Sequence, residues 1–204
     1  MSKPCTYYFA PQSPFAYLGH ARFVALAQRA GARVALRPCD MGKIFTVSGG
    51  VPLAQRAPQR QAYRLAELAR WSRYLQLPLT LQPTFFPVSG DAAARLIIAA
   101  DIAHGADRAL ALTGAIMQAV WVEQKNIADR QSLQQIAELL EFDGSALLKS
   151  SDTPTVATQY QANTDAAIAA GVFGAPWFVV DGDGFWGQDR LDFVERALQT
   201  SVAQ

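Results

Sequence analysis

Hydrophobic positions divide the chain into a strand-containing start, a long helical middle and a strand-containing end. Residues 6–9 form a short aromatic run that is typical of a buried strand, and residues 33–37 predict a second strand. Between them, residues 14–30 are apolar over most of a helical surface, so we expect a helix that is covered on more than one side. Strand, helix and strand in fewer than forty residues predict a βαβ unit with parallel strands.

The middle of the chain shows only helical patterns. Apolar spacing and stop signals predict helices over residues 59–75, 91–104, 107–122, 132–141 and 155–170, with a short piece near 146–150. Asp107 and Ser132 are the expected N-caps of two of these helices. Residues 43–58 contain Ser48-Gly49-Gly50 with further prolines nearby, so we expect this segment to be irregular. Residues 83–89 predict a loop rich in apolar side chains.

Strand character returns near the end of the chain. Residues 177–180 predict a strand, and the Asp-Gly-Asp-Gly sequence at 181–184 separates it from a short apolar pair, as in a β-hairpin. Residues 188–198 predict the last helix, and we expect residues 199–204 to be a frayed tail. The order βαβ, helices, ββα predicts an α/β protein with a thioredoxin-like four-stranded mixed sheet. Residues 1–40 and 171–204 would form that domain, and residues 41–170 a large all-α insertion.

Composition narrows the function classes. The chain has 204 residues, half of them apolar, and a formal net charge of +1. This charge gives no support for a nucleic-acid or anionic-membrane partner. No apolar run is long enough to span a bilayer, and the start lacks a signal-peptide pattern. We therefore expect a cytoplasmic protein.

Cysteine and histidine usage argues against a metal site and a disulfide. The two cysteines, Cys5 and Cys39, and the two histidines, His20 and His104, show no metal-ligand spacing. Cys5 opens one predicted strand and Cys39 closes the neighbouring parallel strand, which places them at opposite ends of the sheet. Both are expected to be buried core thiols.

The junction between the first strand and the first helix carries the first candidate chemistry. Ser13 has the properties of an N-cap, and Pro14 suits the first helical position. Free backbone N–H groups and the macrodipole favour negative charge there, so Ser13 could stabilise an anion such as a thiolate. The alternative, which the local pattern alone favours, is that Ser13 is only a helix cap.

Two later segments carry further candidates. Pro176 precedes a strand after a glycine-rich approach, so its peptide bond could be cis and expose the backbone of Ala175 to an extended peptide ligand. An ordinary strand-edge proline is the alternative. Gly187 permits close approach, and Asp189 could either bind a ligand ammonium group or cap its own helix.

These motifs together resemble a known family. Ser13-Pro14-Phe15-Ala16-Tyr17-Leu18, Gly174-Ala175-Pro176 and Phe185-Trp186-Gly187-Gln188-Asp189-Arg190-Leu191 occur in that order around the helical insertion. In this the chain resembles 2-hydroxychromene-2-carboxylate isomerases, which are relatives of kappa-class glutathione transferases. The resemblance covers essentially the whole chain, and it implies a homodimer and glutathione as the cofactor.

The resemblance also implies a role for each motif. The Ser13 hydroxyl would donate to the glutathione sulfur, and Ala16 takes the place of a second cysteine, which excludes dithiol exchange. The Ala175-Pro176 element would pair with the cysteinyl unit. The γ-glutamyl end would be held by Trp186, Gly187, Gln188 and Asp189.

The implied reaction converts 2-hydroxychromene-2-carboxylate to trans-o-hydroxybenzylidenepyruvate in naphthalene-type aromatic degradation, with the glutathione thiolate as a covalent catalyst. Two alternatives stay open. One is a kappa-like glutathione transferase that conjugates an electrophile, and the other is a non-enzymatic module that binds thiol peptides.

Two positions depart from the family pattern: Ala10 stands where an Asp is common, and Gly50 lies near a common Asn.

An anionic aromatic substrate needs a cation and apolar walls. Lys43 and Arg60 are the candidate cations, and Phe85 is the candidate wall, together with Phe86 and Trp71. Core packing explains the aromatic residues equally well. Arg60 also belongs to a set at helical spacing that is typical of a solvated basic face, which comprises Arg56, Arg60 and Arg64.

Overall fold

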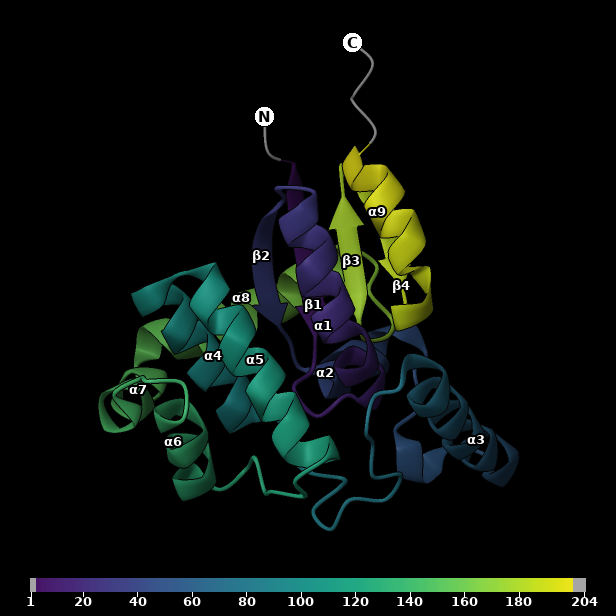
Figure 1. The fold of residues 1–204 in the computed structure, drawn as a ribbon, viewed down its shortest axis with the longest axis horizontal. Coiled ribbons are helices and arrows are strands. Elements are labelled where there is room, and N and C mark those ends of the chain that lie inside the picture. The colour runs from purple at the N-terminus through teal and green to yellow at the C-terminus, as the bar shows by residue number, and fades with distance from the viewer. Residues whose placement is uncertain (1–2, 200–204) are drawn as a thin grey trace.

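A computed structural model describes residues 3–199 of the chain. Its centre is a four-stranded mixed sheet of order β2-β1-β3-β4 (Figure 1). Strand β1 (Pro4–Phe9) pairs in parallel with β2 (Arg33–Pro38) and antiparallel with β3 (Trp177–Val180), which pairs antiparallel with β4 (Asp183–Trp186). The predicted α/β fold with a mixed sheet is confirmed.

Helices cover both faces of the sheet and one of its edges. Helix α1 connects the two parallel strands and, with α9, lies on one face, while α2 and α8 lie behind the sheet and α4 to α7 form a group beside β2 (Figure 1). The helices are α1 (Pro14–Arg29), α2 (Met41–Ser48), α3 (Pro58–Leu75), α4 (Asp91–His104), α5 (Ala106–Trp121), α6 (Arg130–Glu138), α7 (Gly144–Ser151), α8 (Pro154–Ala169) and α9 (Leu191–Gln199). In the described part of the chain, no helix is long and apolar enough to cross a membrane.

The segment expected to be irregular, residues 43–58, is partly helical. It contains most of α2 and a short 3₁₀ helix, η1 (Leu53–Gln55). The Asp40 carboxylate accepts hydrogen bonds from the N–H groups of Gly42 and Lys43, and Gly49 ends the helix in a left-handed conformation. The expectation was wrong because a capped helix with a single fully buried anchor, Ile44, shows little apolar periodicity.

Three helix starts also differ from the expectation. Helix α5 begins after Gly105, so Asp107 lies within its first turn, and α6 is capped by Asp129, whose carboxylate accepts from the N–H of Ser132. The last predicted helix is divided into a 3₁₀ helix, η2 (Gln188–Arg190), and α9. Gln199 is the last residue of α9, and the rest of the predicted frayed tail lies outside the described residues.

Side chains of the sheet alternate between two hydrophobic layers. On the α1 face, Tyr7, Phe23 and Phe178 form a ring cluster with centroid separations of 4.6–5.1 Å. On the opposite face, Tyr8 and Trp177 pack with residues of α2 and α8. The α1 layer continues without a break into the helical group, because α4 and α5 contact β2 and α5 contacts α1. This shared core holds α1 rigidly on the sheet.

One buried histidine connects α1 to both of its neighbours. His20 Nε2 lies 3.0 Å from the carbonyl oxygen of Leu110, and Nδ1 lies 3.4 Å from the Tyr7 hydroxyl. Since a carbonyl can only accept, Nε2 carries the proton and Nδ1 accepts from Tyr7. Gly114 makes the close approach of α5 possible, because a Cβ at this position would come within 3.3 Å of the imidazole. His20 is therefore held in its neutral form.

The buried imidazole should make folding sensitive to acid. Burial lowers the pKa of His20 to about 4, whereas an unfolded chain takes up this proton near pH ~6.5. Stability from this residue is therefore present at neutral pH and lost as the pH falls from the unfolded to the folded pKa. We predict that wild type loses about 2 kcal/mol more than His20→Gln in the free energy of unfolding between about pH 7 and pH 5. Urea denaturation at both pH values measures this difference, and equal losses in the two proteins would contradict it.

Candidate active site

Ser13 lies at the N-terminus of α1, at the point where the chain leaves the sheet. Its Oγ accepts a hydrogen bond from the N–H of Ala16 at 3.2 Å, so it caps the helix, and Pro14 occupies the first helical position. The same oxygen donates to the carbonyl oxygen of Ala175 at 3.4 Å, a long contact. The hydroxyl proton is thus only weakly engaged and can be redirected to a better acceptor.

The segment before β3 faces Ser13, and Ala175 in it pairs with no other backbone group of residues 3–199. The Ala175–Pro176 peptide bond is cis, a conformation that the sequence left open, and a second cis bond, Phe86–Pro87, was not foreseen. The N–H and carbonyl groups of Ala175 make no backbone–backbone hydrogen bond within residues 3–199. Such a free pair can accept an extended peptide in the manner of an added strand.

Trp186 forms the outer wall beside this segment. Its ring makes an edge-to-face contact with the ring of Phe173, with centroids 4.8 Å apart, and 53% of Trp186 is exposed. Gly174 lies directly against the indole, and a Cβ at that position would collide with it. The backbone can therefore run close beneath an exposed aromatic surface.

A carboxylate marks the other end of the site. Gly187 adopts φ 104°, and the Asp189 carboxylate lies so close to its Cα that a Cβ would collide with it. Asp189 is in η2 and forms an ion pair with Arg190 at 2.7 Å. The structure shows no side-chain hydrogen bond from Asp189 to the backbone of its own helix within the described residues, so helix capping does not account for this residue.

Gln188 is turned inward and is held by α1. Only 2% of Gln188 is exposed, and Arg22 Nη2 donates both to its carbonyl oxygen, at 3.0 Å, and to its side-chain oxygen. Burial lowers the pKa of Arg22, and the nearby Asp189 partly opposes this shift. Gly19 allows the contact, because a Cβ there would lie 2.8 Å from that of Gln188. Gln188 therefore fixes η2 on α1.

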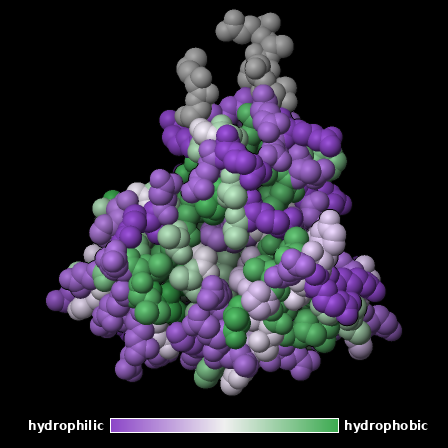
Figure 2. Space-filling model, viewed as in Figure 1, coloured by the Kyte–Doolittle hydropathy of each residue, from purple (hydrophilic) through white to green (hydrophobic). Residues whose placement is uncertain are grey.

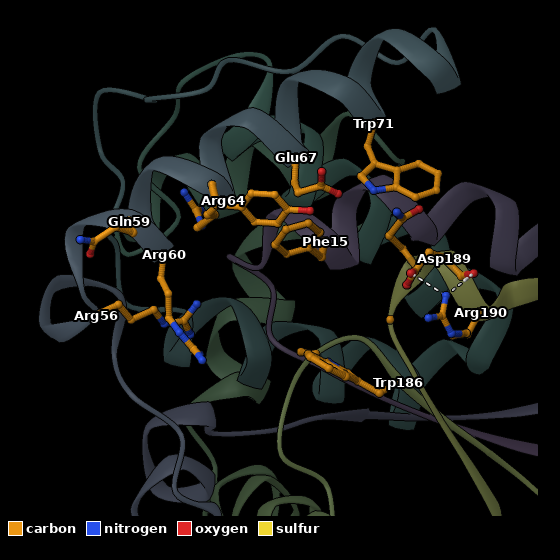
Figure 3. Close-up of a pocket in the computed structure, with 14 residues that line it drawn as sticks. Phe15, Arg56, Gln59, Arg60, Arg64, Glu67, Trp71, Trp186, Asp189 and Arg190 are labelled. Carbon is orange, nitrogen blue, oxygen red and sulfur yellow. Dashed lines mark hydrogen bonds and ion pairs between the residues drawn. The ribbon is translucent and has the colours of Figure 1, made fainter.

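Two adjoining cavities connect these groups. The larger, here called the α3 cavity, has a volume of about 770 Å³ and lies between α3 and the segment from Trp186 to Arg190 (Figure 3). The smaller, here called the Ser13 cavity, has a volume of about 380 Å³. The residues that line both are Phe15, Arg56, Arg64, Ala175 and Trp186. A molecule that extends from Asp189 to Ser13 can therefore pass through both.

Helix α3 forms one wall of this space but belongs only marginally to the core. Leu68 is its one buried residue within the described chain, and hydrophilic residues cover most of its outer surface (Figure 2). Its inward face carries Arg60, Arg64 and Trp71 into the α3 cavity. This wall of the α3 cavity is thus formed by a peripheral element of the fold.

The predicted substrate contacts are only partly brought together. Arg60 lines the α3 cavity, but Lys43 lines neither cavity, and its Nζ donates to Gln161 at 2.6 Å on the outer surface. Phe85 is 45% exposed and also lines neither cavity, whereas its neighbour Phe86 lines the Ser13 cavity. Pro176 is buried behind Ala175 and contributes to the site through the bond that joins them.

The sequence interpretation missed two arginines, Arg22 and Arg64. Arg22 comes two helical turns after Phe15, a spacing that could have placed it on the same side of α1. Arg64 was assigned to a solvated basic face, but it packs over the rings of Phe86 and Trp121. No local pattern distinguishes an arginine that points inward from one that points outward.

The chain itself supplies no reactive thiol within the described residues. Cys5 and Cys39 are both free and buried. They lie at opposite ends of the β1–β2 pair, because Cys5 is near the start of β1, whereas Cys39 follows the end of β2 and donates its N–H to the carbonyl oxygen of Phe9. Burial raises the pKa of each thiol to about 12. A thiolate that reaches Ser13 must therefore come from a ligand.

The chain is similar to known proteins over nearly its whole length. The model of the DSBA-like thioredoxin domain family matches residues 6–199. A 2-hydroxychromene-2-carboxylate isomerase from Sphingobium xenophagum is 32% identical over 97% of this chain and 99% of its own. Glutathione S-transferase kappa 1 from Homo sapiens is 25% identical over 91% of this chain and 86% of its own.

A solved structure supports the same relationship. The structure of a 2-hydroxychromene-2-carboxylate isomerase superposes with a TM-score of 0.80 and 27% sequence identity, and it covers 96% of this chain and 94% of its own. The family model and the relatives extend over both strand-containing parts and the helices between them. The chain therefore belongs to the DSBA-like thioredoxin domain family, in the group that contains the 2-hydroxychromene-2-carboxylate isomerases and kappa-class glutathione transferases.

Proposed function

We propose that this protein is a glutathione-dependent isomerase that acts on 2-hydroxychromene-2-carboxylate or a close analogue, in the degradation of aromatic compounds. The observation that carries the proposal is the placement of Ser13. A weakly engaged hydroxyl at a helix N-terminus faces a free backbone segment, and the chain brings no thiol of its own. A cytoplasmic setting, where glutathione is abundant, is part of the same proposal.

The residues of both cavities fit glutathione. The Asp189 carboxylate suits the ammonium group of the γ-glutamyl end, and the free N–H and carbonyl groups of Ala175 suit the cysteinyl backbone. Trp186, which lines both cavities between these points, provides the apolar surface along the way. With its ends held in this order, the tripeptide would present its sulfur to Ser13.

Ser13 would act by lowering the pKa of the bound thiol. A free thiol titrates near ~8.5, so most of it is protonated at neutral pH. The Ser13 hydroxyl would turn from Ala175 toward the sulfur while its oxygen continues to accept from the N–H of Ala16. The α1 macrodipole favours the same negative charge. Bound glutathione supplies the nucleophilic thiolate that reversible addition to the substrate requires.

Conjugation of an electrophile is the second function that an observation favours. The similarity to the kappa-class transferase extends over nearly the whole chain, and the Ser13 arrangement would activate a thiol equally for conjugation. The two activities differ in the fate of glutathione. It is recovered unchanged after isomerisation and consumed by conjugation, so its concentration during turnover distinguishes them.

Replacing Ser13 should separate its catalytic role from its capping role. We predict that Ser13→Ala raises the pKa of the bound glutathione thiol by about one to two units and lowers kcat/KM about 10- to 100-fold, because a hydrogen bond to a charged group is lost. The thiolate absorbance of the complex as a function of pH measures the pKa. An ultraviolet assay of 2-hydroxychromene-2-carboxylate conversion measures the rate.

A second variant excludes an effect through the helix cap. Ser13→Asp keeps an oxygen that accepts from Ala16 but adds a negative charge beside the sulfur, so its activity should fall at least as far as that of Ser13→Ala. Ser145→Ala removes an exposed hydroxyl in α7, distant from both cavities, and should leave the activity unchanged. Full activity of Ser13→Asp would reduce Ser13 to a cap.

Asp189 should determine the preference for a γ-glutamyl ammonium group. We predict that wild type binds glutathione about five- to tenfold more tightly than an analogue that lacks this amino group, and that Asp189→Asn binds the two equally. Isothermal titration measures both affinities. Asp192→Asn changes an exposed carboxylate of α9 that lines neither cavity, so it should keep the wild-type preference. A preference that survives in Asp189→Asn would remove this residue from the ammonium site.

A further inference from the structure

One guanidinium in the wall of the cavities has a buried nitrogen without a hydrogen-bond acceptor. Arg64 Nη2 is buried and has no hydrogen-bond acceptor, and Arg64 takes part in none of the ion pairs formed within residues 3–199. Buried polar groups in folded proteins are almost always hydrogen-bonded, and buried charges are almost always paired. The Arg64 guanidinium is therefore available to donate to an anionic group of a ligand.

The position of Arg64 is fixed by aromatic rings. Its Cζ lies 5.2 Å from the ring centroid of Phe86 and 5.9 Å from that of Trp121, a residue with no exposed surface. These distances are typical of cation–π contacts. Burial and the charge of Arg56 lower the pKa of Arg64 to about 10, so the group stays positively charged at neutral pH. A guanidinium that is charged at neutral pH is therefore packed against two aromatic rings.

No acidic side chain of the cavity walls compensates this cation. Among the lining residues, the carboxylates are Glu67, which pairs with Arg70 at 2.5 Å, and Asp189, which pairs with Arg190. Arg56 lines both cavities beside Arg64 and donates its Nε–H to the carbonyl oxygen of Val51. The two like charges repel each other, and an anion between them would relieve that repulsion.

The location of Arg64 indicates which of the two bound molecules would carry the anionic group. Arg56, Arg60 and Arg64 lie at one end of the α3 cavity and Asp189 with Arg190 at the other (Figure 3). Arg64 also lines the Ser13 cavity, whose walls are largely apolar. These walls include Met41, Phe45, Leu53, Phe86 and Pro87. An anion at Arg64 would thus belong to a molecule whose apolar body rests beside Ser13.

We propose that Arg64 binds the carboxylate of the second substrate and makes the Ser13 cavity selective for flat aromatic carboxylates. The assignment rests on the proposed function, which places the thiol at Ser13, but it names a residue for the substrate carboxylate that the similarity to relatives does not identify. The planar guanidinium matches a carboxylate through two parallel hydrogen bonds. Arg64 takes the role that the sequence assigned to Lys43 and Arg60.

Equilibrium binding of an unreactive probe tests the assignment. Coumarin-3-carboxylate has a flat bicyclic body and a carboxylate, and coumarin-3-carboxamide is its neutral counterpart. Wild type should bind the carboxylate at least tenfold more tightly than the amide. Arg64→Met should lose about 10- to 100-fold in affinity for the carboxylate and keep its affinity for the amide. Arg64→Lys should recover part of the loss, since it restores the charge without the fork.

Matched controls locate the effect. Arg73 is an exposed arginine of the same helix, and its side chain lines neither cavity. The Arg73→Met variant should therefore bind both probes as wild type does. Arg64→Met should bind glutathione with unchanged affinity. A loss of glutathione affinity in this variant would instead assign Arg64 to a carboxylate of the cofactor and overturn the proposal. Equal affinity of wild type for the acid and the amide would overturn it as well.

The outcome is separable from that of the proposed function. If wild type turns over no chromene carboxylate but binds the probe through Arg64, the proposed reaction fails while the carboxylate site stands. If turnover occurs and Arg64→Met raises neither the KM for the substrate nor the dissociation constant of the probe, the reaction stands and the assignment of Arg64 is wrong. In the expected result, Arg64→Met raises KM about 10- to 100-fold with a smaller change in kcat.

Discussion

The arrangement of this site depends on how the N-terminus of α1 meets the segment that leads into β3. Ser13 and Ala175 are separated by more than 160 positions in the chain, yet the Ser13 hydroxyl lies 3.4 Å from the Ala175 carbonyl oxygen. The rings of Tyr7, Phe23 and Phe178 fix this distance, because they pack α1 against β1 and β3 in one layer. In a close-packed core α1 cannot slide without opening a cavity, so the hydroxyl stays aimed at one point.

The wall formed by α3 is held by fewer buried contacts than α1. Helix α3 contributes one buried residue to the core, and the loop that follows it is held to α1 by the Tyr17 hydroxyl, which donates to the carbonyl oxygen of Pro78 at 2.7 Å. The rigid side of the site therefore carries Ser13 and Ala175, and the peripheral side carries Arg60 and Arg64. Such a division allows the substrate to change while the chemistry at Ser13 is kept, since changes in α3 leave the ring layer untouched.

The sequence predicts the rigid side well because local chemistry determines it. The strands, the Ser13-Pro14 helix start and the Gly187 turn each follow from residue type and spacing, and their order predicts the mixed sheet. It predicts α2 poorly, since a short helix with one buried anchor leaves almost no periodicity. The inward orientation of Arg64 is beyond a local pattern altogether. It depends on Phe86 and Trp121, which reach the same place from distant parts of the chain.

The charges then divide the cavity into two chemically distinct ends. At one end the Asp189 carboxylate is balanced by Arg190 and is open to an ammonium group, and at the other Arg56 and Arg64 have no acid to pair with. Leaving a cation uncompensated costs stability in the free protein, and this cost is recovered only when a ligand carries an anion to that end. A zwitterionic tripeptide at the first end and an organic acid at the second would satisfy both. The packing of α1 on the sheet thus explains where the Ser13 hydroxyl is held, and the rings of Phe86 and Trp121 explain where Arg64 is held.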